Sequence, residues 1–458
     1  MLLTDIYTNS QIVEKINSLI HSSEDRIHVH GMTGSLSAIV AATIALLNPD
    51  RDQLIIAGNK EEAYYMLNDI EMLLEETDAD FDQKRALLFP SSYRKPRRKS
   101  PQSGAPDQPP QVDDDGGDLL TTDNANILQR SEVVKQLNSG RSMTIVTYPE
   151  ALYEKVVSSR TLTRNTLRLT KGTDTDIDFI VDIMQEYEFD RVDFVVEPGQ
   201  YAVRGGIVDV FSFANEHPYR IEFFDTTIES LRTFDPVTQL SIKQYDQISI
   251  LPNMATRQPD TVTVEEKVPL VHYFGSNDLV WVQGLMFVTE TIQTLFANAG
   301  QDSQHYCSGN EFLKSLLRCR IIEQGNSNYF PNAAAVETLS QPQPPFNKQF
   351  NLLIDTLTQY RDRGYRTIIT VANEQQQRRL EKVFAGTDAT NDPVSLDNGR
   401  SIHIDNIIDH VEFLQCQPNH GFVDDTEHLL CFTDHEIFER YHKYTVRDMR
   451  DTDRKSVV

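Results

Sequence analysis

Short apolar segments alternate with segments of helical periodicity through the first 157 residues, and this alternation constrains the fold more than any other feature of the sequence. The apolar segments have the length and composition of buried strands, while the intervening segments repeat apolar residues every three or four positions. Such alternation predicts an α/β domain in which helices cover a parallel sheet. We expect strands at 26–30, 53–57, 86–89 and 143–148, and helices at 35–47, 61–74 and 125–137.

Residues 158–250 have a different pattern, in which one amphipathic helix precedes a run of short strands. Ile177, Ile180, Val181 and Met184 have the i, i+3, i+4, i+7 spacing of a helix. Pairs rich in glycine, proline and asparagine then separate the expected strands, as turns and bulges do. This block is therefore predicted to be a small α+β domain with an antiparallel sheet. Its expected strands are 192–196, 201–204, 207–213, 219–224 and 228–234.

The rest of the chain divides at a proline-rich segment. Residues 251–345 are less regular and end in Gln341-Pro-Gln-Pro-Pro345, which has the composition of a linker. The strand–helix alternation then resumes, with helices expected at 352–361 and 374–384 and strands at 367–371 and 429–432.

A chain of 458 residues is too long for one hydrophobic core. We predict domains at 1–157, 158–250, 251–345 and 346–458, with a low-complexity loop at about 94–122 inside the first. The charged end, 441–458, has no stop signal, so we expect the sequence to be part of a longer protein.

The formal net charge of −25 disfavours a nucleic-acid partner, because a strongly acidic surface repels phosphates at long range. The segment 94–99 is a local exception, since it is rich in arginine and lysine. Residues 100–118 contain no aromatic residue that could stack on a base, which favours a solvated charged loop. DNA binding through 94–99 remains open as an alternative.

The four cysteines stand far apart and form no CxxC pair, so neither a zinc site nor a disulfide framework is predicted. A reducing compartment, and hence a cytoplasmic location, is expected. No apolar run approaches the ~20 residues that a membrane span needs. The first residues lack the pattern of a signal peptide. We expect no metal and no membrane partner.

The segment from Gly31 to Ala38 follows the first expected strand and opens a helix, which is the position of a phosphate-binding loop. It departs from G-x-x-x-x-G-K-[ST] at three positions. Leu36 replaces the second glycine and is expected to place a side chain where backbone must approach phosphate. Ser37 replaces the lysine that neutralises phosphates, and Ala38 replaces the hydroxyl that binds magnesium. Phosphoryl transfer depends on such groups, so we expect a degenerate, non-functional loop around Gly31, Gly34, Ser37 and Ala38, no cofactor and no catalytic residue.

One stretch is specific enough to suggest relatives. It reads Phe194-Val-Val-Glu-Pro-Gly-Gln-Tyr201-Ala-Val-Arg204-Gly-Gly-Ile-Val-Asp-Val-Phe211 and continues in Tyr219-Arg-Ile-Glu-Phe-Phe224. It resembles the domain shared by the excision-repair helicase UvrB and the bacterial transcription-repair coupling factors. Gly31-Met-Thr-Gly-Ser35 resembles the start of the UvrB phosphate loop. The missing lysine, and a Pro/Asp-rich segment where UvrB has a tyrosine-rich hairpin that grips DNA, favour the coupling factors.

The resemblance implies the non-catalytic N-terminal module of a coupling factor. Such a module has a degenerate RecA- or helicase-like domain in two parts (1–157 and 251–345), an inserted UvrA-binding domain (158–250) and a further small α/β domain (346–458). In that family the module recruits UvrA for nucleotide excision repair and helps to autoinhibit an ATP-driven DNA translocase through contacts with the C-terminal region.

The partners implied by the resemblance are therefore UvrA and the C-terminal region of the full-length protein. RNA polymerase and double-stranded DNA are bound in that family by domains that this chain lacks. The alternative is a UvrB-like nucleotide- or DNA-binding helicase module.

Arg204 is the first candidate for contact with UvrA. It ends an expected strand before Gly205-Gly206, so its guanidinium is expected at an open bend, where it can pair with carboxylates across an interface. By the resemblance it matches the arginine of an R-G motif that contacts UvrA. The competing interpretation is a surface arginine in an intramolecular ion pair.

Four further residues complete the candidate set. Arg191 and Glu197 are expected to be neighbours of Arg204. Strict alternation places Tyr201 on the opposite face of the strand, so it can equally be a core residue. Phe211 stands at a strand end and is either an anchor for the partner or a packing residue.

Two predictions concern structural residues. Arg220, Glu222 and Arg232 alternate with apolar residues, as on an ordinary polar sheet face. Trp281, the single tryptophan, is expected in the core.

Overall fold

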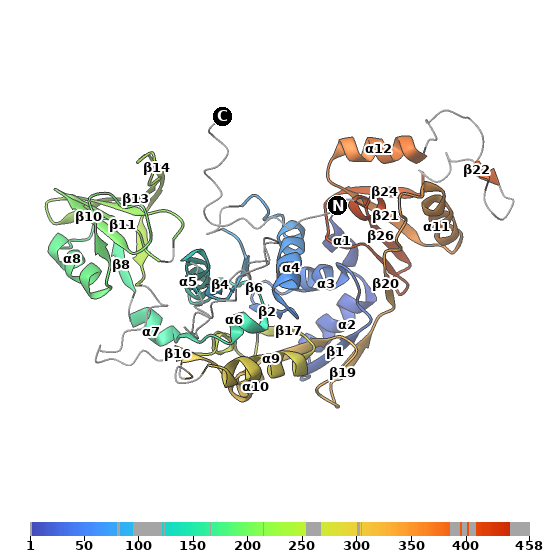
Figure 1. Cartoon of the computed structure of the whole chain (residues 1–458), viewed down its shortest axis with the longest axis horizontal. Helices are drawn as coiled ribbons and strands as arrows, with labels where there is room; N and C mark the ends of the chain where they lie inside the picture. The colour runs from blue at the N-terminus through green and yellow to red at the C-terminus, as the bar shows by residue number, and fades with distance from the viewer. Residues whose placement is uncertain are drawn as a thin grey trace, which may run out of the picture. The chain divides into compact units, whose positions relative to one another are not determined.

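The chain forms two compact units in the computed structural model (Figure 1). The first comprises the described residues of Met1–Leu88, Gln136–Lys155 and 268–439, and the second comprises those of Phe89–Lys135 and Val156–Lys267. The structure describes residues 2–79, 83–94, 121–122, 124–164, 166–213, 215–252, 267–299, 303, 305–384, 394–395, 401–402 and 409–439.

The first unit is built on a parallel sheet of seven strands, in the order β19-β1-β18-β17-β2-β6-β3. This confirms the parallel sheet predicted from the alternating pattern. Strands β17 and β18 lie between β1 and β2, although both come much later in the sequence. The strands are β1 (Arg26–His30), β2 (Gln53–Ile56), β3 (Ala86–Leu88), β6 (Thr144–Thr147), β17 (Leu279–Gln283), β18 (Arg320–Gln324) and β19 (Ala334–Glu337).

Helices cover both faces of this sheet (Figure 1). One face carries α3 (Leu36–Leu47) and α4 (Lys60–Leu73), and the other carries α9 (Leu285–Ala297) and α10 (Gly309–Leu316). Helix α3 is apolar on all sides because α1 (Leu3–Tyr7), α2 (Gln11–Ile20) and α4 also pack against it. Trp281 on β17 is 1% exposed, and its Nε1 donates to Oε1 of Gln53 at 2.8 Å, which confirms the predicted core position.

A second sheet in the first unit has five strands in the order β20-β25-β26-β21-β24. Its strands and helices are β20 (Ser340–Pro342), β21 (Arg366–Val371), β24 (Val411–Gln415), β25 (Phe422–Asp424), β26 (Leu429–Thr433), α11 (Phe350–Asp362), α12 (Glu374–Phe384) and α14 (Asp434–Ile437). The linker predicted at 341–345 was partly wrong, because Gln341 and Pro342 pair with β25. Proline is tolerated there since β20 is an edge strand.

The second unit contains a six-stranded sheet in the order β14-β13-β12-β11-β10-β9, antiparallel except between β9 and β10. Its strands are β9 (Asp190–Arg191), β10 (Gln200–Arg204), β11 (Ile207–Val210), β12 (Tyr219–Phe224), β13 (Thr227–Phe234) and β14 (Ser241–Tyr245). Helix α8 (Ile177–Glu186) buries Ile180 and Met184 in a core shared with Tyr201, Val208 and Ile221. The predicted α+β block is confirmed.

One long helix, α5, and several short elements complete the described part of the chain. They are α5 (Asn124–Leu137), α6 (Pro149–Leu152), α7 (Ser159–Arg164), η1 (Leu270–Tyr273), β4 (Tyr93–Arg94), β5 (Thr121–Thr122), β7 (Val156–Val157), β8 (Leu167–Thr170), β15 (Gln247–Ile250), β16 (Lys267–Val268), β22 (Val394–Ser395) and β23 (Ser401–Ile402).

Three sequence predictions about elements were wrong. The strand expected at 192–196 is absent: β9 ends at Arg191, and the following residues form a loop. The strand expected at 207–213 ends at Val210. The third block is regular between 267 and 342, where it supplies three strands of the seven-stranded sheet.

The four predicted domain bounds remain predictions. Residues 95–120, which hold most of the predicted basic and low-complexity loop, lie outside the described residues. In the described part of the chain, no helix is long and apolar enough to cross a bilayer. Nor do the described His, Cys, Asp and Glu residues form a group of three or more that could hold a metal ion.

Candidate functional site

Arg204 is the last residue of β10, and its side chain lies on the sheet face opposite α8. Its Nη2 donates to Oδ2 of Asp209 on β11, and its Nη1 donates to the carbonyl oxygen of Asp193 at 3.2 Å. The Arg204 side chain is 36% exposed, whereas that of Asp209 is 1% exposed. The intramolecular ion pair is therefore present, yet part of the guanidinium remains accessible.

Asp209 also accepts two hydrogen bonds from Arg220 on β12. Nε of Arg220 lies 2.7 Å from Oδ1, and Nη2 lies 2.8 Å from Oδ2. These bonds raise the pKa of Arg220, whose guanidinium carbon is also 4.2 Å from the ring centroid of Phe234. Since Arg220 alone satisfies both carboxylate oxygens, Arg204 is not required to hold Asp209 in the sheet. Arg220, Glu222 and Arg232 lie on this polar face, as predicted.

The loop between β9 and β10 places apolar side chains beside Arg204. The Arg204 guanidinium carbon lies 4.9 Å from the ring centroid of Phe194, which is 61% exposed. Val196 is 54% exposed, while Val195 between them is buried. An exposed aromatic ring and a half-exposed guanidinium thus form one surface, which we call the Phe194–Arg204 face. Aromatic residues and arginine are both enriched in the buried centres of protein interfaces.

The other predicted contact residues divide into two groups. Arg191 on β9 and Glu197 in the following loop are exposed. Tyr201 and Phe211 are 1% and 5% exposed, so both pack inside the domain in this structure. Tyr201 belongs to the core under α8, and Phe211 packs with Val195. The opposite-face position predicted for Tyr201 is confirmed.

Phe194 and Val196 were missed as site residues because the sequence predicted a strand there. Two apolar residues at i and i+2 look like one buried strand face. The available signal against a strand was Pro198-Gly199, which ends the segment in a turn. Val196 and Glu197 both donate their backbone N–H to Oε1 of Gln200, at 2.9 and 3.1 Å, which holds the loop in a non-extended form.

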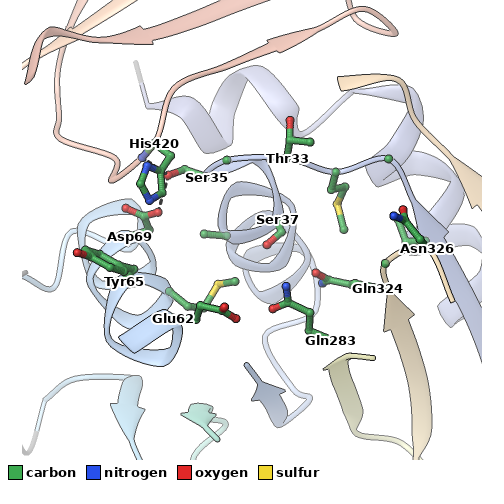
Figure 2. A pocket seen from close by; sticks show the side chains of 17 residues that line it. Thr33, Ser35, Ser37, Glu62, Tyr65, Asp69, Gln283, Gln324, Asn326 and His420 are labelled. Carbon is green, nitrogen blue, oxygen red and sulfur yellow. Dashed lines mark hydrogen bonds between the residues drawn. The ribbon is translucent and has the colours of Figure 1, made fainter. Parts of the chain in front are cut away.

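The phosphate-loop-like segment lies in the first unit, between β1 and α3, beside a cavity of about 310 Å³ (Figure 2). Gly31 and Gly34 have positive φ values of 92° and 56°. Ser37 and Ala38 line the cavity, as their positions in a phosphate loop predict. Leu36 does not: its side chain is fully buried, so the expected obstruction by this residue was wrong.

The polar side chains around this cavity include two carboxyl groups and three neutral amides. Neither lysine nor arginine is among the described residues that line it, whereas Glu62 and Asp69 supply carboxyl groups. Neutral amides of Gln283, Gln324 and Asn326 line the side farther from Asp69 (Figure 2). Burial raises the pKa of Asp69 to about 7, against the opposing effect of hydrogen bonds from Ser35 and Asn419.

Comparison with known sequence families locates one domain. Residues 167–255 match the family model described as the UvrB interaction domain. This part of the chain is similar to UvrB. The match begins at β8 and extends past β15, so it includes the whole six-stranded sheet and the Phe194–Arg204 face.

Curated relatives are similar to parts of the chain of 80 to 142 residues. The transcription-repair-coupling factor of Bacillus subtilis is 29% identical over 142 residues, or 31% of this chain and 12% of that protein. That of Mycobacterium tuberculosis is 41% identical over 80 residues, or 18% of this chain and 6% of that protein. The UvrABC system protein B of Xylella fastidiosa is 34% identical over 137 residues, or 28% of this chain and 20% of that protein. The matched region thus spans only about an eighth of the coupling factors' length.

Proposed function

We propose that this chain is a non-catalytic recruitment module of transcription-coupled nucleotide excision repair, and that residues 166–252 bind UvrA. The observation that carries the proposal is the match of 167–255 to the UvrB interaction domain. The similarity to transcription-repair-coupling factors supports the coupling role.

The contact is proposed to be centred on the Phe194–Arg204 face. The guanidinium of Arg204 can offer its accessible edge to a carboxylate of the partner while the ring of Phe194 buries apolar area. Arg191, at the end of β9, and Glu197, in the loop that follows, are exposed and are proposed as flanking contacts. Tyr201 and Phe211 are proposed to act indirectly, by holding the sheet and the loop in place.

The non-catalytic part of the proposal rests on the phosphate loop. Neither lysine nor arginine is among the described residues that line the cavity, and such side chains supply the charge that stabilises phosphoryl transfer. The alternative is a nucleotide-binding helicase module like UvrB. The cavity supports it, but the absence of lysine and arginine from the described lining residues does not. Two further parts of the proposal rest on the resemblance alone. One is that this chain helps to autoinhibit a translocase. The other is that other parts of a longer protein contact RNA polymerase or DNA.

A calorimetric titration of the chain with UvrA tests the proposal. We expect saturable binding that Arg204→Ala weakens about tenfold or more, which is ~1.4 kcal/mol. Phe194→Ala should weaken it similarly. Both variants should remain folded, because Arg220 keeps Asp209 paired and Phe194 is already largely exposed.

Arg232→Ala is the matched control. Arg232 lies on the same face and pairs with Glu222, but β11 and β12 separate its strand from β10. It should bind UvrA as the native chain does. Equal losses in Arg204→Ala and Arg232→Ala would move the interface away from the Phe194–Arg204 face, and absence of any binding by the native chain would overturn the proposal.

A further inference from the structure

A segment of the five-stranded sheet domain contacts the phosphate-loop-like segment. Residues 417–421, here called the docking segment, lie between β24 and β25. His420 is 385 positions away from Ser35 in the sequence, yet both belong to the first unit. Figure 2 shows His420 beside Ser35 and Asp69, at one end of the cavity.

Ser35 and His420 exchange two hydrogen bonds. The backbone N–H of Ser35 donates to the carbonyl oxygen of His420 at 3.1 Å, and the N–H of His420 donates to Oγ of Ser35 at 2.9 Å. Ser35 precedes Leu36, the first residue of α3. The N–H groups at such a helix start are the ones that bind phosphate oxygens in a working phosphate loop. Here a carbonyl oxygen of the same chain occupies one of them.

Asp69 on α4 joins the same contact. It is 3% exposed and accepts from Oγ of Ser35 at 2.6 Å. It also accepts from the backbone N and from Nδ2 of Asn419, both at 2.8 Å. Nδ2 of Asn419 reaches the carbonyl oxygen of Tyr65 as well, at 2.9 Å. A buried carboxyl group is costly unless donors surround it, and two of its three donors come from the docking segment.

Glu436 on α14 holds the docking segment from the other side. Its Oε2 accepts from the backbone N of Gly421 at 2.7 Å and from Oγ1 of Thr433 at 2.9 Å. Its Oε1 lies 3.2 Å from Nδ1 of His420, and this contact raises the pKa of that histidine. The carbonyl of His420 is therefore fixed by bonds from within its own domain.

Gly34 allows the close approach. It has a φ of +56°, and a Cβ at this position would lie 2.8 Å from the carbonyl oxygen of Gly421. A glycine here is thus needed both for backbone conformation and for the space that the docking segment takes. This second requirement has nothing to do with a nucleotide.

We propose that the degenerate phosphate loop serves as an internal docking site, in which the carbonyl oxygen of His420 takes the N–H of Ser35 and residues 417–421 join the five-stranded sheet domain to the seven-stranded one. The loop keeps its shape because it has a new occupant within the chain. This role is independent of UvrA binding by the second unit.

Hydrogen exchange on the full chain tests the proposal with Gly34→Ala. The added methyl group should displace the docking segment, so that the amides of Ser35, Asn419 and His420 exchange about tenfold faster or more. Gly140→Ala is the control, because Gly140 also has a positive φ, of 78°, and nothing lies within 4 Å of its Cβ position. The proposal is overturned if the three amides exchange alike in both variants.

Two further measurements separate displacement of the docking segment from global unfolding and from ligand binding. Retained protection of the β17 and β18 amides shows that Gly34→Ala still folds. If Gly34→Ala does not fold, Asn419→Ala replaces it, because it removes the side-chain bonds to Asp69 and Tyr65. Exchange of the same three amides is then measured in that variant. The bond from Oη of Tyr7 to Oδ2 of Asp424, at 2.8 Å, should keep the domains together in that variant. Addition of inorganic phosphate to the native chain should leave the Ser35 exchange rate unchanged. A phosphate-dependent change at Ser35 and His420 would mean that a ligand competes for the loop, against the proposal.

Discussion

Asp209 lies beneath two arginines that have different tasks. Arg220 is 13% exposed and bonds both carboxylate oxygens, while Arg204 bonds one oxygen and remains partly accessible. The first arginine therefore stabilises the domain, and the second is available to a partner. Sequence alternation predicted the shared face but could not tell these two arginines apart.

Arg220→Ala should lower the free energy of unfolding of the second unit by about 3 kcal/mol, because it leaves a buried carboxylate with only the single bond from Arg204. Arg232→Ala should cost under ~1 kcal/mol, since its partner Glu222 is 28% exposed and the pair is screened. Urea unfolding followed by circular dichroism measures both. Equal losses would contradict the distinction between the buried and the exposed pair.

Asp69 should make the stability of the first unit depend on pH. Its pKa in the folded chain, about 7, exceeds the ordinary value of 3.8 because the group is buried. Between about pH 4 and pH 7 the folded chain keeps a proton that the unfolded chain has lost, so stability falls as pH rises, by roughly 4 kcal/mol at most. Asp69→Asn should flatten this slope in urea titrations at several pH values. An unchanged slope would contradict the assignment.

Other titratable groups facing Asp69 affect the same experiment. The raised pKa of His420 adds stability below pH 6.5 that is lost as pH rises, so some slope should persist in Asp69→Asn. Glu436 has a lowered pKa, so the stability that it contributes is present above about pH 4.5 and is lost only as the pH falls further. Burial raises the pKa of Cys416 to about 12 and that of Cys431 above its ordinary range, so neither titrates there.

At the scale of elements, the loop at 192–199 shows where periodicity is misleading. Phe194 and Val196 alternate with Val195 as strand residues do, but here the middle residue is buried and the outer two are exposed. Val195 is held by Ala202 and Phe211, which are distant enough in sequence that no local pattern reports the contact. In contrast, α8 was predictable, because its apolar spacing and the cap at Asp176 are both local.

The order of strands in the seven-stranded sheet is likewise not apparent from local sequence patterns. Strands β1 and β2 are joined by α3, yet β17 and β18 lie between them. Strands β1 and β2 are visible as short apolar runs, whereas β17 and β18 lie in a block for which the sequence predicted no strand. Register and order are decided by long-range pairing that a single sequence does not display.

At the scale of the whole molecule, this order predicts how the chain can be divided. A fragment of residues 1–157 lacks β17, β18 and β19, so β1 loses both of its strand neighbours and β2 loses one of its two. The unpaired N–H and C=O groups of these strands would then be exposed. We expect that fragment to show no cooperative thermal transition by circular dichroism. A fragment of residues 166–252 retains the core under α8 and should melt cooperatively. Cooperative melting of both fragments would contradict the conclusion that residues 1–157 need the later strands of the seven-stranded sheet to fold.

The sequence by itself determined the α/β class, the antiparallel block, the loss of the phosphate-binding lysine and the similarity to UvrB and the coupling factors. These features depend on residue type and local spacing, which a chain displays directly. Only the tertiary structure decided that Phe194 stacks on Arg204, that Leu36 turns into the core and that His420 reaches Ser35. The physical reason is that these contacts join residues through packing and hydrogen bonds across sheets and loops, and the free energy that selects them is not contained in any short segment of the chain.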